Sequence, residues 1–261
     1  MLTAIGDILN WLAAGVLFPL MMLPLASFAS GAKRSVALWL ASVGAVIGAS
    51  SVFAVLAVDL APPAWTTGLG AAMILGIAAG AALIAAKGAA FLAEKFAAFA
   101  DMVVRGVGRL SLYLIIAMAL VQFAIVVFRY VFGLNFIAMQ ESVTYLHGAV
   151  FLLAGGYALL TDDHVRVDIL YRDASPRKKA MVDLAGTYLF LFPFCLVALW
   201  AAGPYVANSW AVREGSMEQS GIKGVYLLKS LIPVYLVLLS LAGFCVATRA
   251  AAILSGRSAG R

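Results

Sequence analysis

The stretch "LSLYLIIAMALVQFAIVVFRYVF", Leu110 to Phe132, holds one charged residue, Arg129, in 23 positions. A run of about 20 apolar residues is the length that an α-helix needs to cross a bilayer. Every backbone amide must be satisfied inside hydrocarbon, so only helices or closed barrels span it, and this run is too long for a barrel strand. The stretch therefore predicts a transmembrane helix.

The rest of the composition extends this prediction to the whole chain. Hydrophobic residues make up 64% of the 261 residues, charged residues only 11%, and the mean hydropathy is +1.04, whereas a soluble domain is about half apolar. We expect an all-α integral membrane protein. Cys195 and Cys245 lie inside apolar runs, where a thiol behaves as a small hydrophobe. Seven spans are predicted, at about 8 to 29, 35 to 57, 67 to 87, 110 to 132, 140 to 160, 180 to 203 and 229 to 252.

The basic residues predict the orientation of these spans. Of the 18 Lys and Arg, 14 fall on one side of the predicted membrane, in the segments after the first, third, fifth and seventh spans. By the positive-inside rule that side is the cytoplasm, which places the amino terminus outside and the carboxyl terminus in the cytoplasm. Topology explains the basic pI of about 9.4, so the charge gives no reason to expect a nucleic-acid partner.

The segment Lys87 to Arg109 divides the chain into two parts. It is amphipathic at helical spacing, with Leu92, Phe96 and Phe99 on its apolar face. We expect an interfacial helix over 91–109; the alternative is a cytoplasmic continuation of the third span. It separates an extension of about three spans, 1–90, from a four-span core, 110–261.

Three ionisable residues are candidates for intramembrane chemistry. Arg129 near the end of the fourth span and Glu141 near the start of the fifth are expected at similar depth, and we predict a structural ion pair. The alternative is an ion or proton site. His147 has no second intramembrane histidine to complete a bis-histidine haem site, so neither a haem nor any other cofactor is expected.

Two polar segments connect the later spans. "TDDHVRVDILYRDASPRKK", from Thr161, is the predicted cytoplasmic link, in which His164, Arg166 and Asp168 are expected to hold the link or contact a partner; its basic residues oppose a metal site. Ser175 and Pro176 are typical of a helix cap and first turn. The outer segment "NSWAVREGSMEQSGIKGVYLLKSLIP" is either a solvated loop or a docking surface for a soluble partner. The docking candidates are Arg213, Glu214, Glu218 and Lys223.

An ordered set of motifs resembles the DctQ-type small membrane subunit of tripartite ATP-independent periplasmic (TRAP) transporters. The set comprises Arg129, the pair Gln140 and Glu141, "GGYAL" followed by "HVRVDIL", then "SMEQSGIKG" and "KSLIP". It covers about the last 150 residues, and the N-terminal extension is similar to that of longer members.

The resemblance implies a non-catalytic subunit in the bacterial inner membrane, with a periplasmic substrate-binding protein and a large membrane subunit as partners. It implies that the large subunit holds the sodium and substrate sites for the uptake of small organic acids. This chain is then a brace that also helps to dock the binding protein. The sequence leaves two alternatives: a self-sufficient ion-coupled transporter using Arg129, Glu141 and His147, and the membrane anchor of a redox enzyme.

Overall fold

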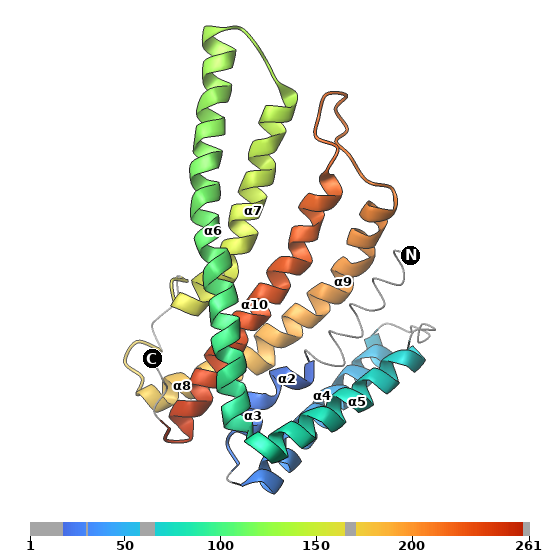
Figure 1. The fold of residues 1–261 in the computed structure, drawn as a ribbon, viewed down its shortest axis with the longest axis vertical. Helices are drawn as coiled ribbons and strands as arrows, with labels where there is room; N and C mark the ends of the chain where they lie inside the picture. The colour runs from blue at the N-terminus through green and yellow to red at the C-terminus, as the bar shows by residue number, and fades with distance from the viewer. Residues whose placement is uncertain (1–17, 30, 58–65, 165–170, 258–261) are drawn as a thin grey trace. The chain divides into compact units, whose positions relative to one another are not determined.

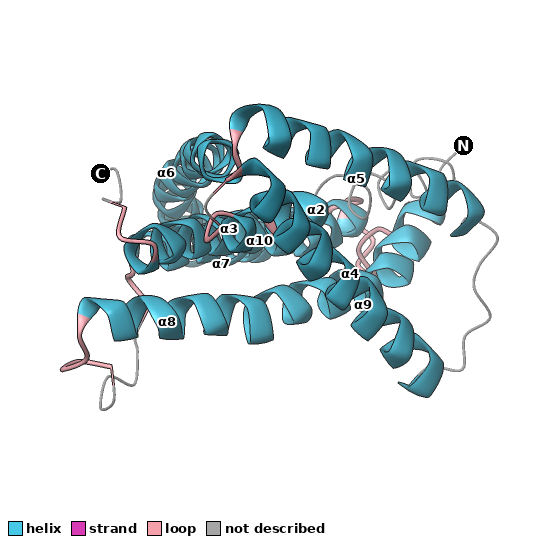
Figure 2. Ribbon diagram, turned by 90° about the horizontal axis from the view of Figure 1, so that it is seen from below, coloured by secondary structure: helices cyan, strands magenta, loops and turns pink. Residues whose placement is uncertain are grey.

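The described part of the chain is helical throughout. The structure is a computed structural model, and it describes residues 18–29, 31–57, 66–164 and 171–257, in which no strand occurs. Figures 1 and 2 show the helices and the loops that join them. In chain order they are α2 (Phe18–Met21), α3 (Leu23–Ala26), α4 (Ala32–Ala57), α5 (Thr66–Lys87), α6 (Ala89–Val131), α7 (Ile137–Thr161), α8 (Pro176–Gly186), the π-helical turn η2 (Thr187–Leu191), α9 (Phe192–Ala211) and α10 (Val225–Leu254).

Four stretches in the described residues are long and apolar enough to cross a membrane. They are α6, α7, the continuous run Pro176–Ala211 and α10, and they include the predicted spans from 110 to 252. Within the run Pro176–Ala211, η2 ends two residues before Pro193, which has no N–H to donate to the turn before it. The prediction of an all-helical protein with several membrane spans is confirmed. The count of seven and the orientation of the termini stay predictions.

The first predicted span is not one helix in its described part. Residues 1–17 lie outside the described residues, and from Phe18 onward the chain forms α2 and α3, separated at Met22. Pro19 and Pro24 explain the break, because a proline interrupts the hydrogen-bond ladder of a continuous helix. The second and third predicted spans correspond closely to α4 and α5.

The segment predicted as an interfacial helix is the first half of α6. Gly88, with a φ of 83°, ends α5 in the left-handed region that glycine adopts without strain. From Ala89 the chain runs as one helix of 43 residues, about twice the length that a span requires. The alternative that this segment continues the third span is therefore wrong, and the segment has no boundary with the fourth span near residue 109.

The chain divides into two units. The first comprises Met1–Ala98, Asp173–Leu184 and Ala247–Arg261; the second comprises Phe99–Arg172 and Ala185–Val246. In the first unit, α4 packs on α5 through Trp39, which is fully buried. Its indole Nε1 donates to the carbonyl of Pro19 at 2.9 Å, and a Cβ at Gly80 would lie 2.8 Å from the ring atom Cζ2. Gly80 thus lets the two helices approach closely.

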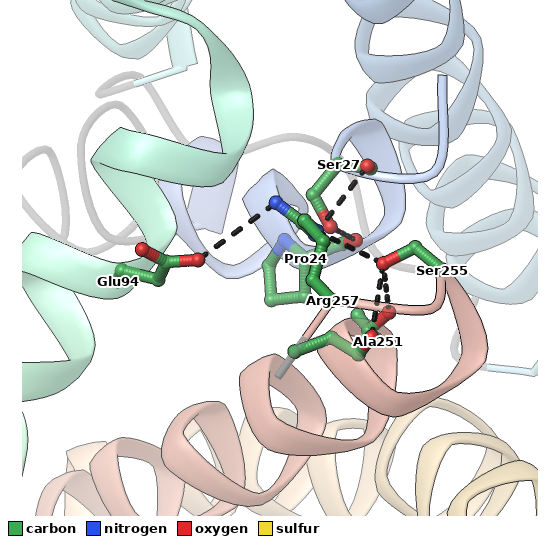
Figure 3. A network of polar contacts seen from close by, with 7 residues as sticks. Pro24, Ser27, Glu94, Ala251, Ser255 and Arg257 are labelled. Carbon is green, nitrogen blue, oxygen red and sulfur yellow. Dashed lines mark hydrogen bonds and ion pairs between the residues drawn. The ribbon is translucent and has the colours of Figure 1, made fainter. Parts of the chain in front are cut away.

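Polar contacts around Arg257 join three segments of the first unit, as Figure 3 shows. Its Nε donates to Ser255 Oγ at 3.0 Å, directly after α10. Its Nη2 donates to the carbonyl of Ser27 at 3.5 Å, and its Nη1 lies 3.8 Å from Glu94 Oε1 near the start of α6. Arg257, just after α10, is therefore linked to the extension by one hydrogen bond and to the start of α6 by one ion pair.

In the second unit, the "GGYAL" motif packs α7 against both α6 and α10. A Cβ at Gly156 would lie 3.0 Å from the backbone carbonyl of Leu238, and one at Gly155 would lie 2.6 Å from the ring of Tyr235, both on α10. Tyr157 packs on Gly108 of α6. This motif is thus a packing device, because small residues let helices approach closely where no hydrophobic effect drives their association.

The core of this unit lies between α9 and α10. It is formed by Cys195, Leu236 and Leu239, with Leu191, Ile232 and Tyr235 packed around them. Cys195 and Cys245 are both buried, as expected for small hydrophobic side chains in apolar runs.

Candidate functional site

The loop between α9 and α10, Val212–Gly224, begins at a tightly terminated helix end. Arg213 has a φ of 48°, in the left-handed region. The backbone N–H groups of Arg213 and Glu214 donate to the carbonyls of Trp210 and Ser209, at 3.3 and 3.0 Å. This pair of bonds is the Schellman motif, in which glycine usually holds the place that Arg213 has here. It turns the chain sharply away from α9.

Backbone hydrogen bonds then close the loop on itself. The N–H of Ser216 donates to the carbonyl of Ile222 at 3.1 Å, and that of Gly221 donates to Glu218 at 3.1 Å. At the base, the N–H of Tyr226 donates to the carbonyl of Glu214 at 3.4 Å. A compact loop of this length with adjacent ends has the character of an Ω-loop, a class that is frequently functional. Figure 1 shows it as the orange connection above α9 and α10.

Glu141 on α7 binds both arms of this loop. Ser216 Oγ donates to its Oε1, and the backbone N–H of Ile222 donates to its Oε2 at 2.6 Å. The same Ser216 hydroxyl accepts the N–H of Glu218 at 3.0 Å. Hydrogen bonds to an ionised carboxylate are shorter and stronger than neutral ones, so Glu141 stabilises one conformation of the loop.

A second set of contacts supports the base of the loop. Lys229 Nζ lies 2.5 Å from Glu214 Oε2 and 4.0 Å from the centroid of the Tyr205 ring. The hydrogen bond from Lys229 lowers the pKa of the Glu214 carboxyl. Trp210 Nε1 donates to Ser230 Oγ at 2.8 Å, and the Trp210 ring meets Tyr226 edge-on, with centroids 4.7 Å apart. The ends of α9 and α10 are therefore held together by a cation–π contact, an ion pair and an aromatic pair.

The structure places all four predicted docking residues on this loop. Arg213, Glu218 and Lys223 are exposed, whereas Glu214 is half-buried and is bound to Lys229. Lys229 was not predicted as a site residue, although the "KSLIP" motif contains it and a lysine near a glutamate across a short loop is a signal for an ion pair. Ser216 was also missed, and no spacing in the sequence indicates it.

Glu141 has partners other than the one that the sequence predicts. Within the described residues it binds Ser216 and Ile222 and forms no ion pair with Arg129, which is exposed near the end of α6. The reason is that the loop folds back over the first turns of α7 and supplies two donors to the carboxylate, a contact that local spacing does not reveal.

The predicted link residues are only partly described. His164 is exposed just beyond α7, while Arg166 and Asp168 lie outside the described residues. Ser175 caps α8 as predicted: its Oγ accepts the N–H of Lys178 at 3.4 Å, and its carbonyl accepts that of Lys179 at 2.9 Å. The predicted roles of His164, Arg166 and Asp168 stay predictions.

Comparison with known proteins identifies the family. Residues 118–253 match the family described as "Tripartite ATP-independent periplasmic transporters, DctQ component", a region that includes α7, the α9–α10 loop and nearly all of α10. The comparison with curated proteins found no match, and neither did the comparison with solved structures. Because the match covers more than half of the chain, this protein belongs to the DctQ family of small permease components of TRAP transporters.

Proposed function

We propose that this small permease subunit braces the large transport subunit in the bacterial inner membrane and offers its α9–α10 loop to the periplasmic substrate-binding protein. The large subunit then carries the sodium-coupled uptake of small organic acids. The observation that carries this proposal is the conformation of the loop, which is closed by its own backbone and bound at both arms by Glu141. A loop that only connected two helices would need no such attachment.

One face of α6 supports the bracing role. Leu112, Ile116, Leu120 and Phe123 recur on one side of this helix and are all exposed. Among the 18 most apolar consecutive residues of α6, only 6% are buried within this chain, whereas the corresponding share in α10 is 61%. We propose that this face packs against the large subunit, since α10 is already largely buried within this chain.

The charge of the loop supports the docking role. Arg213, Glu218 and Lys223 are exposed on the loop that also carries Met217, whose side chain is fully exposed. An exposed apolar residue on a loop with exposed charges fits a transient protein contact, in which such charges mainly affect encounter rates. The positive-inside rule predicts that this loop lies on the periplasmic side, where a soluble binding protein can reach it.

Co-purification and reconstitution test the proposal. A tagged form of this chain should retain the large subunit in detergent, and liposomes should take up substrate only when both subunits and the binding protein are present. Replacing Leu120 and Phe123 together with alanine should reduce recovery of the large subunit. The matched control replaces Leu189 and Phe190 of η2, which are equally exposed and should tolerate alanine.

Two outcomes would contradict the proposal. Uptake by this chain alone would favour a self-sufficient transporter, and equal recovery of the large subunit with both double variants would remove the α6 face from the interface.

A further inference from the structure

We propose that Glu141 is a positioning residue that holds the α9–α10 loop in the conformation that docks the binding protein. This inference rests on the docking role proposed above. It assigns Glu141 neither to a structural ion pair with Arg129 nor to an ion site. Instead, Glu141 controls the loop through Ser216 and Ile222.

Both oxygens of the carboxylate are used, one for each arm of the loop. Ser216 lies on the arm that leaves α9 and Ile222 on the arm that returns to α10, and these two residues also bond to each other through their backbones. Within the described residues, the hydrogen bonds that join residues 215–223 to a neighbouring helix are those to Glu141. Through this carboxylate α7 holds both arms of the loop, while Tyr145 of α7 meets the last loop residue, Gly224.

The sequence of the loop leaves room for this carboxylate. A Cβ at Gly221 would lie 2.7 Å from Glu141 Oε1 and 2.5 Å from Ser216 Cβ. A Cβ at Gly215 would lie 3.4 Å from Lys223 Cα, so the two arms pass close to each other there. The glycines of "GSMEQSGIKG" thus permit the tight approach of the arms to each other and to Glu141.

The bonds to Glu141 fix the exposed tip. Glu218 donates its N–H to the same Ser216 hydroxyl that binds Glu141. The exposed residue Glu218 is therefore held beside the residue that Glu141 binds. A rigid docking element loses less conformational freedom on binding than a mobile one. Without Glu141 the tip would sample more conformations, and a higher concentration of binding protein would be needed for the same occupancy.

The test combines hydrogen exchange with uptake in the reconstituted complex. In Glu141→Gln an amide N–H₂ replaces one carboxylate oxygen, so one acceptor for the loop is lost. Losing a hydrogen bond to a charged group raises the equilibrium constant for local opening by a factor of about ten or more. We expect amide exchange in residues 214–224 to rise at least about tenfold. The concentration of binding protein at half-maximal uptake should rise as well, while the maximal rate stays unchanged.

Two further variants sharpen the test. Ser216→Ala should produce a smaller shift in the same two quantities, and combining it with Glu141→Gln should add less than the sum because both changes remove one shared bond. Ser142→Ala is the matched control, since its hydroxyl bonds to Met139 within its own helix, and it should change neither quantity.

The outcomes separate this inference from the docking role itself. Unchanged exchange in both Glu141→Gln and Ser216→Ala would overturn the inference, and so would a lower maximal rate at an unchanged half-maximal concentration, which points to an ion site. Faster exchange without a change in the half-maximal concentration would overturn it too. If reversing the charges of Glu218 and Lys223 also left that concentration unchanged, the docking role of the loop would fall with it.

Discussion

Replacing Gly156 with alanine tests the packing of α7 on α10, which positions the loop described above. The added Cβ would lie 3.0 Å from both the carbonyl carbon and the carbonyl oxygen of Leu238, and 3.1 Å from its Cβ. Two of these three atoms belong to the backbone of a buried helix, so the neighbour cannot move aside by changing a rotamer. We expect the helices to separate by a few tenths of an ångström.

Two opposing terms set the size of the effect. Overpacking a close contact costs about 2 kcal/mol, whereas alanine in place of glycine inside a helix contributes about 1 kcal/mol. The net loss is therefore about 1 kcal/mol, which lowers the Tm of a chain of this size by about 2–4 °C. Gly106 of α6 is the matched control, because a Cβ there meets nothing within 4 Å and no proline follows it. Gly106→Ala should raise the Tm by about 2–4 °C through helix propensity alone.

The assay is thermal unfolding of the purified chain in detergent, followed by tryptophan fluorescence, with both variants measured beside the wild type. The two Tm values should differ by about 4–8 °C. If Gly156→Ala raised the Tm as much as Gly106→Ala does, the close contact between α7 and α10 would be refuted.

The remaining predictions concern the loop, the end of α10 and the link after α7. Because the hydrogen bond from Lys229 lowers the pKa of Glu214 below its ordinary 4.5, the Glu214 carboxylate stabilises the loop at every pH above 4.5 and loses this effect as the pH falls through the lowered value. Amide exchange of residues 212–224, corrected for intrinsic rates, should therefore be constant from neutral pH to about 5 and rise below the ordinary value. Glu214→Gln should reduce that rise, and the part that remains comes from the Glu141 carboxylate, which also binds the loop. Arg257→Ala should lower the Tm by no more than about 4 °C, because exposed ion pairs contribute about 0–1 kcal/mol; a much larger loss would show that these contacts hold the extension more firmly. Arg166→Ala and Asp168→Ala should each reduce recovery of the large subunit with this chain, and normal recovery with both would exclude the predicted contact.

The sequence by itself determined the helical class, the four core spans and the family. These properties depend on local patterns: an apolar run such as Leu110 to Phe132 is a membrane helix whatever surrounds it, and Ser175 followed by Pro176 begins a helix by its own chemistry. The absence of a helix boundary near residue 109 was not predictable in this way, since an amphipathic segment and an apolar one can belong to the same helix. The break between α2 and α3 has a local cause in Pro19 and Pro24. The first span was predicted from the length of its apolar run, and that length does not reflect where the prolines lie.

The tertiary structure alone decided what the polar and glycine residues contact. Glu141 lies 75 residues from Ser216 and 81 from Ile222, and nothing in the sequence between them indicates that the loop returns to α7. Arg129 is the nearer charge along the chain, so spacing suggests that pair and does not reveal the contacts of Glu141 with Ser216 and Ile222. In the same way the "GGYAL" motif indicates the family, but its letters do not say that Gly156 lies against the backbone of Leu238. Local composition determines which segments become helices, but a hydrogen bond or a close packing contact depends on which segments meet, and that is decided only when the helices assemble.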